Sequence, residues 1–144
     1  MGHLDFPDRL VTRIPVGEIT LTAGLGGIGK STFHAWIIAQ ITVGTLPGIH
    51  RGSPSACIIC ANEDSWDRTI VPRLVAAGAD LDLVYRVDVI ESEQTESLSL
   101  PADIEDLAAE IETRPVALVS LDPVMSLIAS GIDSHKDQEV RQAL

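Results

Sequence analysis

The chain has 144 residues, of which 45% are hydrophobic, and its mean hydropathy is +0.22. These values are typical of a single globular domain with a buried core, and they exclude a disordered chain. The formal net charge of −11 repels phosphate backbones, so nucleic-acid binding would need a local basic patch. No run approaches the roughly 20 apolar residues of a membrane span, and MGHLDFPDRL lacks a signal-peptide pattern, so we expect a cytoplasmic protein.

Short apolar runs alternate with amphipathic stretches along the chain. We expect strands at 18–23, 56–61, 83–90 and 116–121, and helices at 31–42, at 65–78, from Pro101 and from about Ser134. The helix at 65–78 should be interrupted at Pro72, which has no backbone donor, and should end at Gly78.

This alternation predicts an α/β fold, in which helices cover both faces of a mostly parallel sheet as a three-layer sandwich. We expect one domain over residues 1–144, with residues 1–13 as a lead-in segment. In such sheets ligands bind beyond the carboxyl ends of the strands, so the residues that follow each strand are the first candidates for a site.

The stretch GLGGIGKST, residues 24–32, follows the first expected strand and opens the first expected helix. Gly24, Gly29, Lys30 and Ser31 satisfy the pattern G-x-x-x-x-G-K-[ST]. Glycines allow successive N–H groups to turn toward an anion, and the helix aims its positive end at the same point. We therefore predict a phosphate-binding loop rather than a glycine-rich turn without a ligand. Its residues are Gly24, Leu25, Gly26, Gly27, Ile28, Gly29, Lys30, Ser31 and Thr32.

Two acidic positions complete the predicted site. Asp122 ends the apolar run VALVSLD and is expected to hold Mg²⁺ through water, while the Ser31 hydroxyl binds the ion directly. Glu63 follows the second expected strand and is the preferred group to activate the attacking water. Asp64 is the competing candidate, although its position suggests a cap for the helix that follows.

The two cysteines form a C-x-x-C pair inside the second expected strand. Because side chains alternate along a strand, Cys57 and Cys60 should point to opposite faces of the sheet. We interpret them as buried core thiols rather than as half of a zinc site or a redox pair.

The order GEITLTAGLGGIGKST, CIICANEDS with PRLVAAGAD, and VALVSLDPV resembles the RecA-like ATPase domain of RepA-type hexameric replicative helicases, relatives of the DnaB class. The resemblance covers residues from about Arg13 to Leu144. It implies ATP and Mg²⁺ as cofactors, Lys30 and Ser31 in the nucleotide loop, Glu63 as the catalytic base and Asp122 as the magnesium-associated acid. It further implies a homo-oligomeric ring and single-stranded DNA as a partner.

Members of that family continue with a further core strand, an arginine finger and DNA-binding loops, so we expect this chain to be the N-terminal part of such a domain. Arg68, Arg73 and Arg141 are too few and too scattered to replace those parts, and we interpret them as surface charges or helix pairs. Two functions remain open: an ATPase of the helicase type, and a nucleotide-binding module or remnant that hydrolyses ATP poorly. A small-molecule kinase is disfavoured because no arginine-rich lid is visible.

Overall fold

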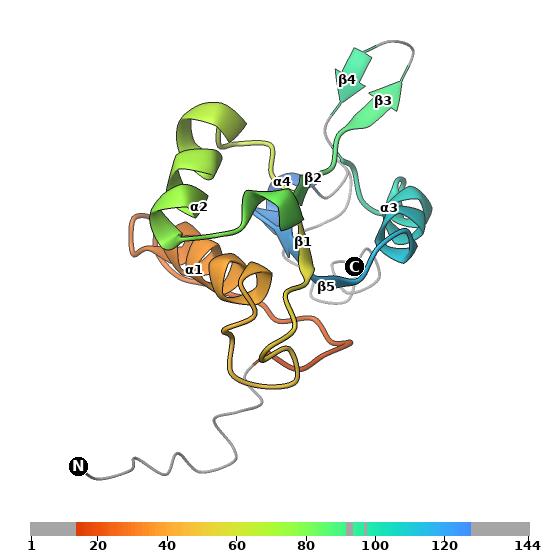
Figure 1. Cartoon of the computed structure of the whole chain (residues 1–144). Coiled ribbons are helices and arrows are strands. Elements are labelled where there is room, and N and C mark those ends of the chain that lie inside the picture. Colours follow the sequence, from red (N-terminus) through yellow and green to blue (C-terminus); the bar gives the residue numbers. More distant parts are fainter. Residues whose placement is uncertain (1–13, 92–93, 97, 128–144) are drawn as a thin grey trace, which may run out of the picture.

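The computed structural model describes residues 14–91, 94–96 and 98–127. A central sheet carries α1 and α2 on one side and α3 on the other (Figure 1). This arrangement confirms the expected three-layer α/β fold.

The central sheet has three parallel strands in the order β2-β1-β5. These are β1 (Ala56–Cys60), β2 (Val84–Arg86) and β5 (Val116–Leu121). Ile58 at the centre of β1 pairs with Tyr85 of β2 on one side and with Val119 of β5 on the other. The expected strands at 56–61 and 116–121 are thereby confirmed.

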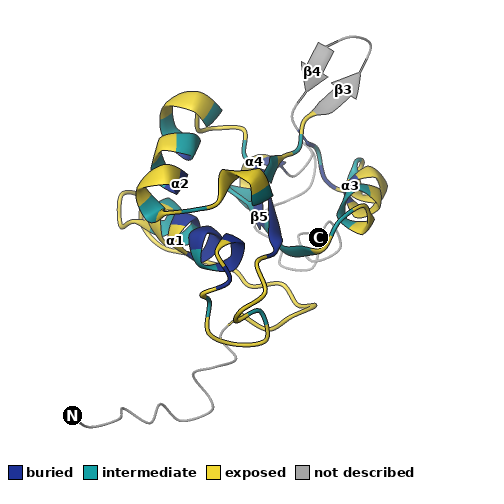
Figure 2. Cartoon of the chain, in the orientation of Figure 1, coloured by how far each residue is buried: buried dark blue, intermediate teal, exposed yellow. Residues whose placement is uncertain are grey.

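The sheet separates two apolar cores. On one face Cys57 and Ile59 pack with the buried side of α1 (Lys30–Thr42) and with Leu74 of α2 (Val71–Ala77). On the other face Ile58 and Cys60 pack with Leu98, Leu100, Leu107 and Leu127. All five residues of β1 are buried, as Figure 2 shows for the centre of the molecule. Because both faces of β1 are covered, its continuous apolar sequence is explained.

The two cysteines behave as predicted. Cys57 belongs to the core under α1 and Cys60 to the core on the opposite face, and both are free thiols. Burial raises the pKa of Cys57 to about 12 and that of Cys60 to about 11, because it disfavours the charged thiolate. Both groups are therefore neutral thiols at physiological pH.

The segment expected as one helix at 65–78 is divided. A π-helical turn, Trp66–Ile70, precedes α2, and Pro72 lies in the first turn of α2, where a missing N–H costs no helical hydrogen bond. Gly78 ends α2 in the left-handed conformation with φ of 81°. The interruption near Pro72 and the stop at Gly78 are both confirmed.

Two other expectations need revision. The strand expected at 83–90 is two strands, because after β2 the chain leaves the sheet into a hairpin of β3 (Val89–Glu91) and β4 (Gln94–Glu96). The helix expected from Pro101 begins later, as α3 (Ile104–Glu112), and a short α4 (Val124–Leu127) follows β5 without having been expected. The helix expected from about Ser134 lies outside the described residues.

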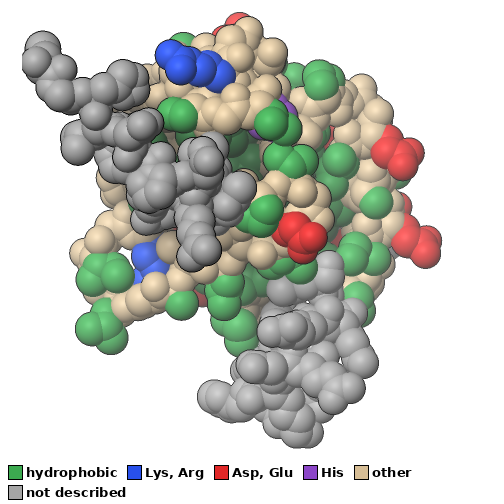
Figure 3. All heavy atoms as spheres, turned by 90° about the horizontal axis from the view of Figure 1, so that it is seen from below, with side chains coloured by type: hydrophobic (Ala, Val, Ile, Leu, Met, Phe, Trp, Pro, Cys, Tyr) green, Lys and Arg blue, Asp and Glu red, His purple; other side chains and the backbone are tan. Residues whose placement is uncertain are grey.

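The strand expected at 18–23 is wrong. These residues have no strand pairing, and Ile19 and Leu21 are 68% and 74% exposed. The alternation of Ile19 and Leu21 with polar residues fits a half-buried strand, but strand formation depends on a neighbour to pair with and a surface to pack on. Figure 3, the view from below, shows hydrophobic side chains scattered over the surface at this end of the molecule.

Candidate functional site: a phosphate-binding loop beside the sheet

The glycine loop lies immediately before α1, and its backbone needs the residues that occupy it. Gly27 and Gly29 have φ angles of 78° and 93°, which lie in the left-handed region that other residues rarely adopt. Gly29 is also the N-terminal boundary residue of α1. The two glycines thus let the chain fold back on itself and enter the helix within a few residues.

The Lys30 side chain folds back over this loop. Its Nζ atom donates hydrogen bonds to the carbonyl oxygens of Gly24 and Leu25, each at 2.8 Å. Nζ is therefore held at the loop by groups five and six residues earlier in the chain. A phosphate in the loop would find its main counter-charge already in place.

The start of α1 is suited to an anion. Its first turn contains no acidic residue, and no side chain among the described residues caps it. The first N–H groups of a helix lack helical acceptors and carry the positive end of the helix dipole. Together with Lys30, these free donors form a site for negative charge.

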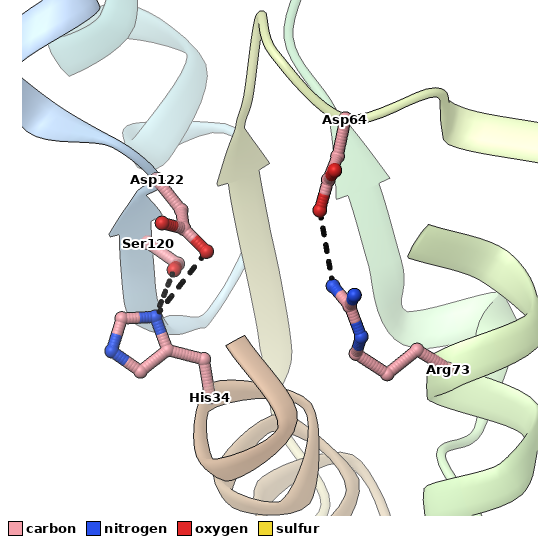
Figure 4. Close-up of polar contacts among 5 residues, drawn as sticks. All are labelled: His34, Asp64, Arg73, Ser120 and Asp122. Carbon is pink, nitrogen blue, oxygen red and sulfur yellow. Dashed lines mark hydrogen bonds and ion pairs between the residues drawn. The ribbon is translucent and has the colours of Figure 1, made fainter. Parts of the chain in front are cut away.

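Asp122 follows β5 directly and lies beside α1, where its carboxylate faces His34 (Figure 4). His34 Nδ1 lies 4.0 Å from Asp122 Oδ2 and 3.5 Å from Ser120 Oγ. His34 comes one helical turn after Lys30, so the same face of α1 presents both groups. The contact with His34 thus places Asp122 beside α1, the helix that follows the glycine loop.

Asp64 lies on the other side of the end of β1 and forms an ion pair with Arg73 of α2, with 3.1 Å between Oδ2 and Nη1 (Figure 4). The residue that caps the following π-helical turn is Ser65, whose hydroxyl accepts from the N–H of Arg68. The expectation that Asp64 is this cap is wrong, because Ser65 takes the capping position and the Asp64 carboxylate is turned toward Arg73.

A small cavity lies between the cluster of His34, Ser120 and Asp122 and the Asp64–Arg73 pair. It measures about 30 Å³, which is room for one or two waters. Its polar lining includes Ser31, His34, Asp64, Arg73, Ser120 and Asp122. The structure therefore brings together Ser31 and Asp122, the two residues predicted to hold a metal ion. Glu63, which precedes Asp64 in the sequence, is exposed and does not line this cavity.

The donors at this cavity suit Mg²⁺. The Ser31 hydroxyl and the Asp122 carboxylate are hard oxygen ligands, and Mg²⁺ commonly keeps several waters while binding one or two protein oxygens and phosphates. The two thiols are excluded as ligands because they are buried in the cores. The donor types present, a hydroxyl and a carboxylate, therefore suit Mg²⁺.

The sequence reasoning missed His34, Ser120 and the pairing role of Arg73. A signal for His34 was present, since a position four residues after Lys30 on a helix shares its face. The Asp64–Arg73 pair had no comparable signal, because it depends on how α2 packs against the end of β1.

No helix in the described part of the chain combines the length and the apolar character needed to cross a membrane. Among known proteins, a family model described as "AAA domain" matches residues 7–144. No curated protein and no solved structure gave a significant match. The glycine loop, Lys30 and the parallel sheet agree with that family match, and the chain belongs to the AAA domain family as a nucleotide-binding P-loop ATPase domain.

Proposed function

We propose that this chain binds Mg-ATP at the loop of residues 24–32 and belongs to a motor that hydrolyses it. The observation that carries the proposal is the convergence of four features: Lys30, the free N–H groups of α1, Ser31 and Asp122. The positive charge of Lys30 and the backbone donors lie at the glycine loop and the start of α1, and the oxygen ligands Ser31 and Asp122 line a cavity that begins at the next residue of that helix.

Each group has a distinct role in this proposal. The N–H groups of the loop and of α1 bind the phosphates, and Lys30 exchanges its hydrogen bonds to Gly24 and Leu25 for contacts to the β- and γ-phosphates. Ser31 and Asp122 hold Mg²⁺, Asp122 through water. The ion neutralises charge that develops on the phosphates.

Glu63 is the proposed base that orients or deprotonates the attacking water. Its support is its place in the loop after β1, two residues beyond Ala61, which lines the cavity. Asp64 is less suited because its carboxylate is paired with Arg73, so binding a water would require that pair to open.

The resemblance to RepA-type helicases extends the proposal to a homo-oligomeric ring that acts on single-stranded DNA in the cytoplasm. In such a ring an arginine from a neighbouring subunit would stabilise the transition state. The second candidate function is a nucleotide-binding module with little hydrolysis, which is favoured by the position of Glu63 outside the cavity lining.

Phosphate release from Mg-ATP separates the two functions. We expect the wild type to release phosphate, faster at concentrations that allow association, and Glu63→Gln to bind ATP equally well but release at least about tenfold less. Asp64→Asn is the matched control, since it changes the neighbouring carboxylate. Equal release by Glu63→Gln and the wild type would reject Glu63 as the base, and binding without release by the wild type would favour the binding module.

A further inference from the structure

Two hydrogen bonds join the loop that carries Glu63 to the loop that follows Asp122. Asn62 Nδ2 donates to the backbone oxygen of Ser126 at 3.0 Å, and Ser126 Oγ donates to Asn62 Oδ1 at 2.7 Å. Both distances are those of good hydrogen bonds. The amide of one side chain is thus held by both the backbone and the side chain of a residue 64 positions away.

A second contact joins the same two loops at their base. The N–H of Asp122 donates to the carbonyl oxygen of Cys60 at 3.0 Å, where β1 and β5 end. The two loops are therefore fastened twice: by the backbone as they leave the sheet, and by Asn62 with Ser126 further out. Two separated attachments fix the relative position of two segments far better than one, because a single attachment leaves them free to pivot.

The far end of the Asp122 loop is itself anchored. Leu127 is 2% exposed in the core on the α3 face, and its carbonyl oxygen accepts from the N–H of Leu100 at 2.7 Å. Ser126 also approaches the oxygen of Pro123, which makes the loop compact. A shift of Ser126 is thus resisted from the core side, so the link through Asn62 transmits that rigidity to the loop of Glu63.

We propose that Asn62 and Ser126 form a positioning link that fixes the loop of Glu63 relative to the loop of Asp122, and so sets the geometry of the magnesium site. The inference rests on the proposed function, since it assigns Asp122 to magnesium and Glu63 to the attacking water. Asn62 precedes Glu63 directly, and Ser126 lies four residues after Asp122. Neither residue is a ligand or a base; both act through their neighbours.

The link is expected to contribute to site geometry more than to stability. Both side chains are exposed, so their loss leaves no buried polar group without a partner. A comparable exposed hydrogen bond lies elsewhere in the chain: Thr45 Oγ1 donates to Gln40 Oε1 at 2.8 Å near the end of α1. Thr45→Ala therefore removes a comparable exposed hydrogen bond away from the phosphate loop.

Amide hydrogen exchange of the nucleotide-free protein tests whether the link exists. We expect Asn62→Ala to accelerate exchange in residues 123–127 and Ser126→Ala to accelerate it in residues 61–64, while β1 and α1 keep their wild-type protection. Thr45→Ala should leave both loops unchanged. Unchanged exchange in 123–127 for Asn62→Ala would overturn the link.

The affinity for ATP with and without magnesium tests its positioning role. We expect Asn62→Ala and Ser126→Ala each to reduce the strengthening of binding by Mg²⁺ by about fivefold, the double variant to lose no more than either single variant, and Ser126→Thr to retain the wild-type value. Faster exchange without a loss of the magnesium effect would show a purely structural contact and would overturn the positioning role. A folded wild type that binds no Mg-ATP would reject the proposed function and this role with it, whereas the exchange result would still decide whether the link exists.

Discussion

The strand β1 and the segment at 18–23 were both expected to be strands, yet they differ in almost every structural respect. Strand β1 pairs on both edges, is buried on both faces and joins the two cores. The segment at 18–23 has no strand pairing and exposes Ile19 and Leu21. The difference teaches that apolar residues become a strand only where neighbours supply both hydrogen bonds and a packing surface. We therefore expect stability to be concentrated in the sheet, and the proposed phosphate loop follows a segment that should contribute little to it.

The largest expected effect comes from truncating an apolar side chain in each region. Ile58→Ala, in the middle of β1, should lower the free energy of unfolding by about 2–5 kcal/mol, because it removes buried contacts and leaves a cavity. Leu21→Ala should change it by less than about 0.5 kcal/mol, since the side chain is exposed. Denaturant unfolding of both variants measures the difference. A cost for Leu21→Ala close to that of Ile58→Ala would break the comparison.

Alkaline pH should lower the free energy of unfolding through the two cysteines of β1. Burial raises the pKa of Cys57 from 9.0 to about 12 and that of Cys60 to about 11, so in the unfolded chain these thiols lose their protons first. The stability that the protonated thiols give the folded state is fully present below pH 9. It is lost as the pH rises toward 11 to 12, and the free energy of unfolding then falls by at most about 1.4 kcal/mol per pH unit for each thiol. The double variant Cys57→Ala, Cys60→Ala has neither of these titrating thiols, so its free energy of unfolding should fall less steeply between pH 9 and 11. Parallel pH profiles for the two proteins would contradict the assignment.

Two glycines, one in the glycine loop and one outside it, allow a second comparison. Gly29 and Gly52 have φ angles of 93° and 81°, and a Cβ atom would meet open space at both positions. Alanine at either should cost about 1–2 kcal/mol of backbone strain. Only Gly29→Ala should also weaken nucleotide binding, by about tenfold, because only that residue shapes the phosphate loop. Equal affinities for the two variants would remove Gly29 from the site.

The smallest effect is expected at the Asp64–Arg73 pair, beyond the end of β1. Both side chains are partly exposed, so the pair should contribute about 0.2–1 kcal/mol to stability. A double-mutant cycle with Asp64→Asn and Arg73→Gln measures this coupling, and 0.5 M salt should reduce it. A coupling well above this range would mean that the pair is part of a more rigid site than its exposure suggests.

Much of the fold could be predicted because it depends on local signals. The apolar runs at 56–61 and 116–121, the stop at Gly78 and the break near Pro72 were all visible as residue types with a physical consequence. The opposite orientations of Cys57 and Cys60 followed from strand geometry alone. The hairpin of β3 and β4 was missed because its pairing of Ile90 with Thr95 lies in a polar, acidic stretch without a strong turn signal.

The site was predictable where one motif carries the chemistry and less so where packing assembles it. Lys30, Ser31 and Asp122 were proposed from spacing and from their places beside apolar runs, and the structure brings the last two to one cavity. The contacts of His34 with Ser120 and of Asn62 with Ser126 join residues 86 and 64 positions apart. Such contacts depend on how α1 and the β1 and β5 loops pack, which no local pattern in the sequence specifies.

The most direct test of the account is titration of the folded chain with a fluorescent ATP analogue and magnesium, comparing the wild type with Lys30→Ala. Arg51→Ala is the control, because it removes an exposed basic residue outside the loop. We expect the wild type and Arg51→Ala to bind alike and Lys30→Ala to bind at least about tenfold more weakly, since it loses a charged hydrogen-bond donor to the phosphates. Binding by Lys30→Ala equal to that of the wild type, or no binding by a folded wild type, would contradict the phosphate-binding role of residues 24–32.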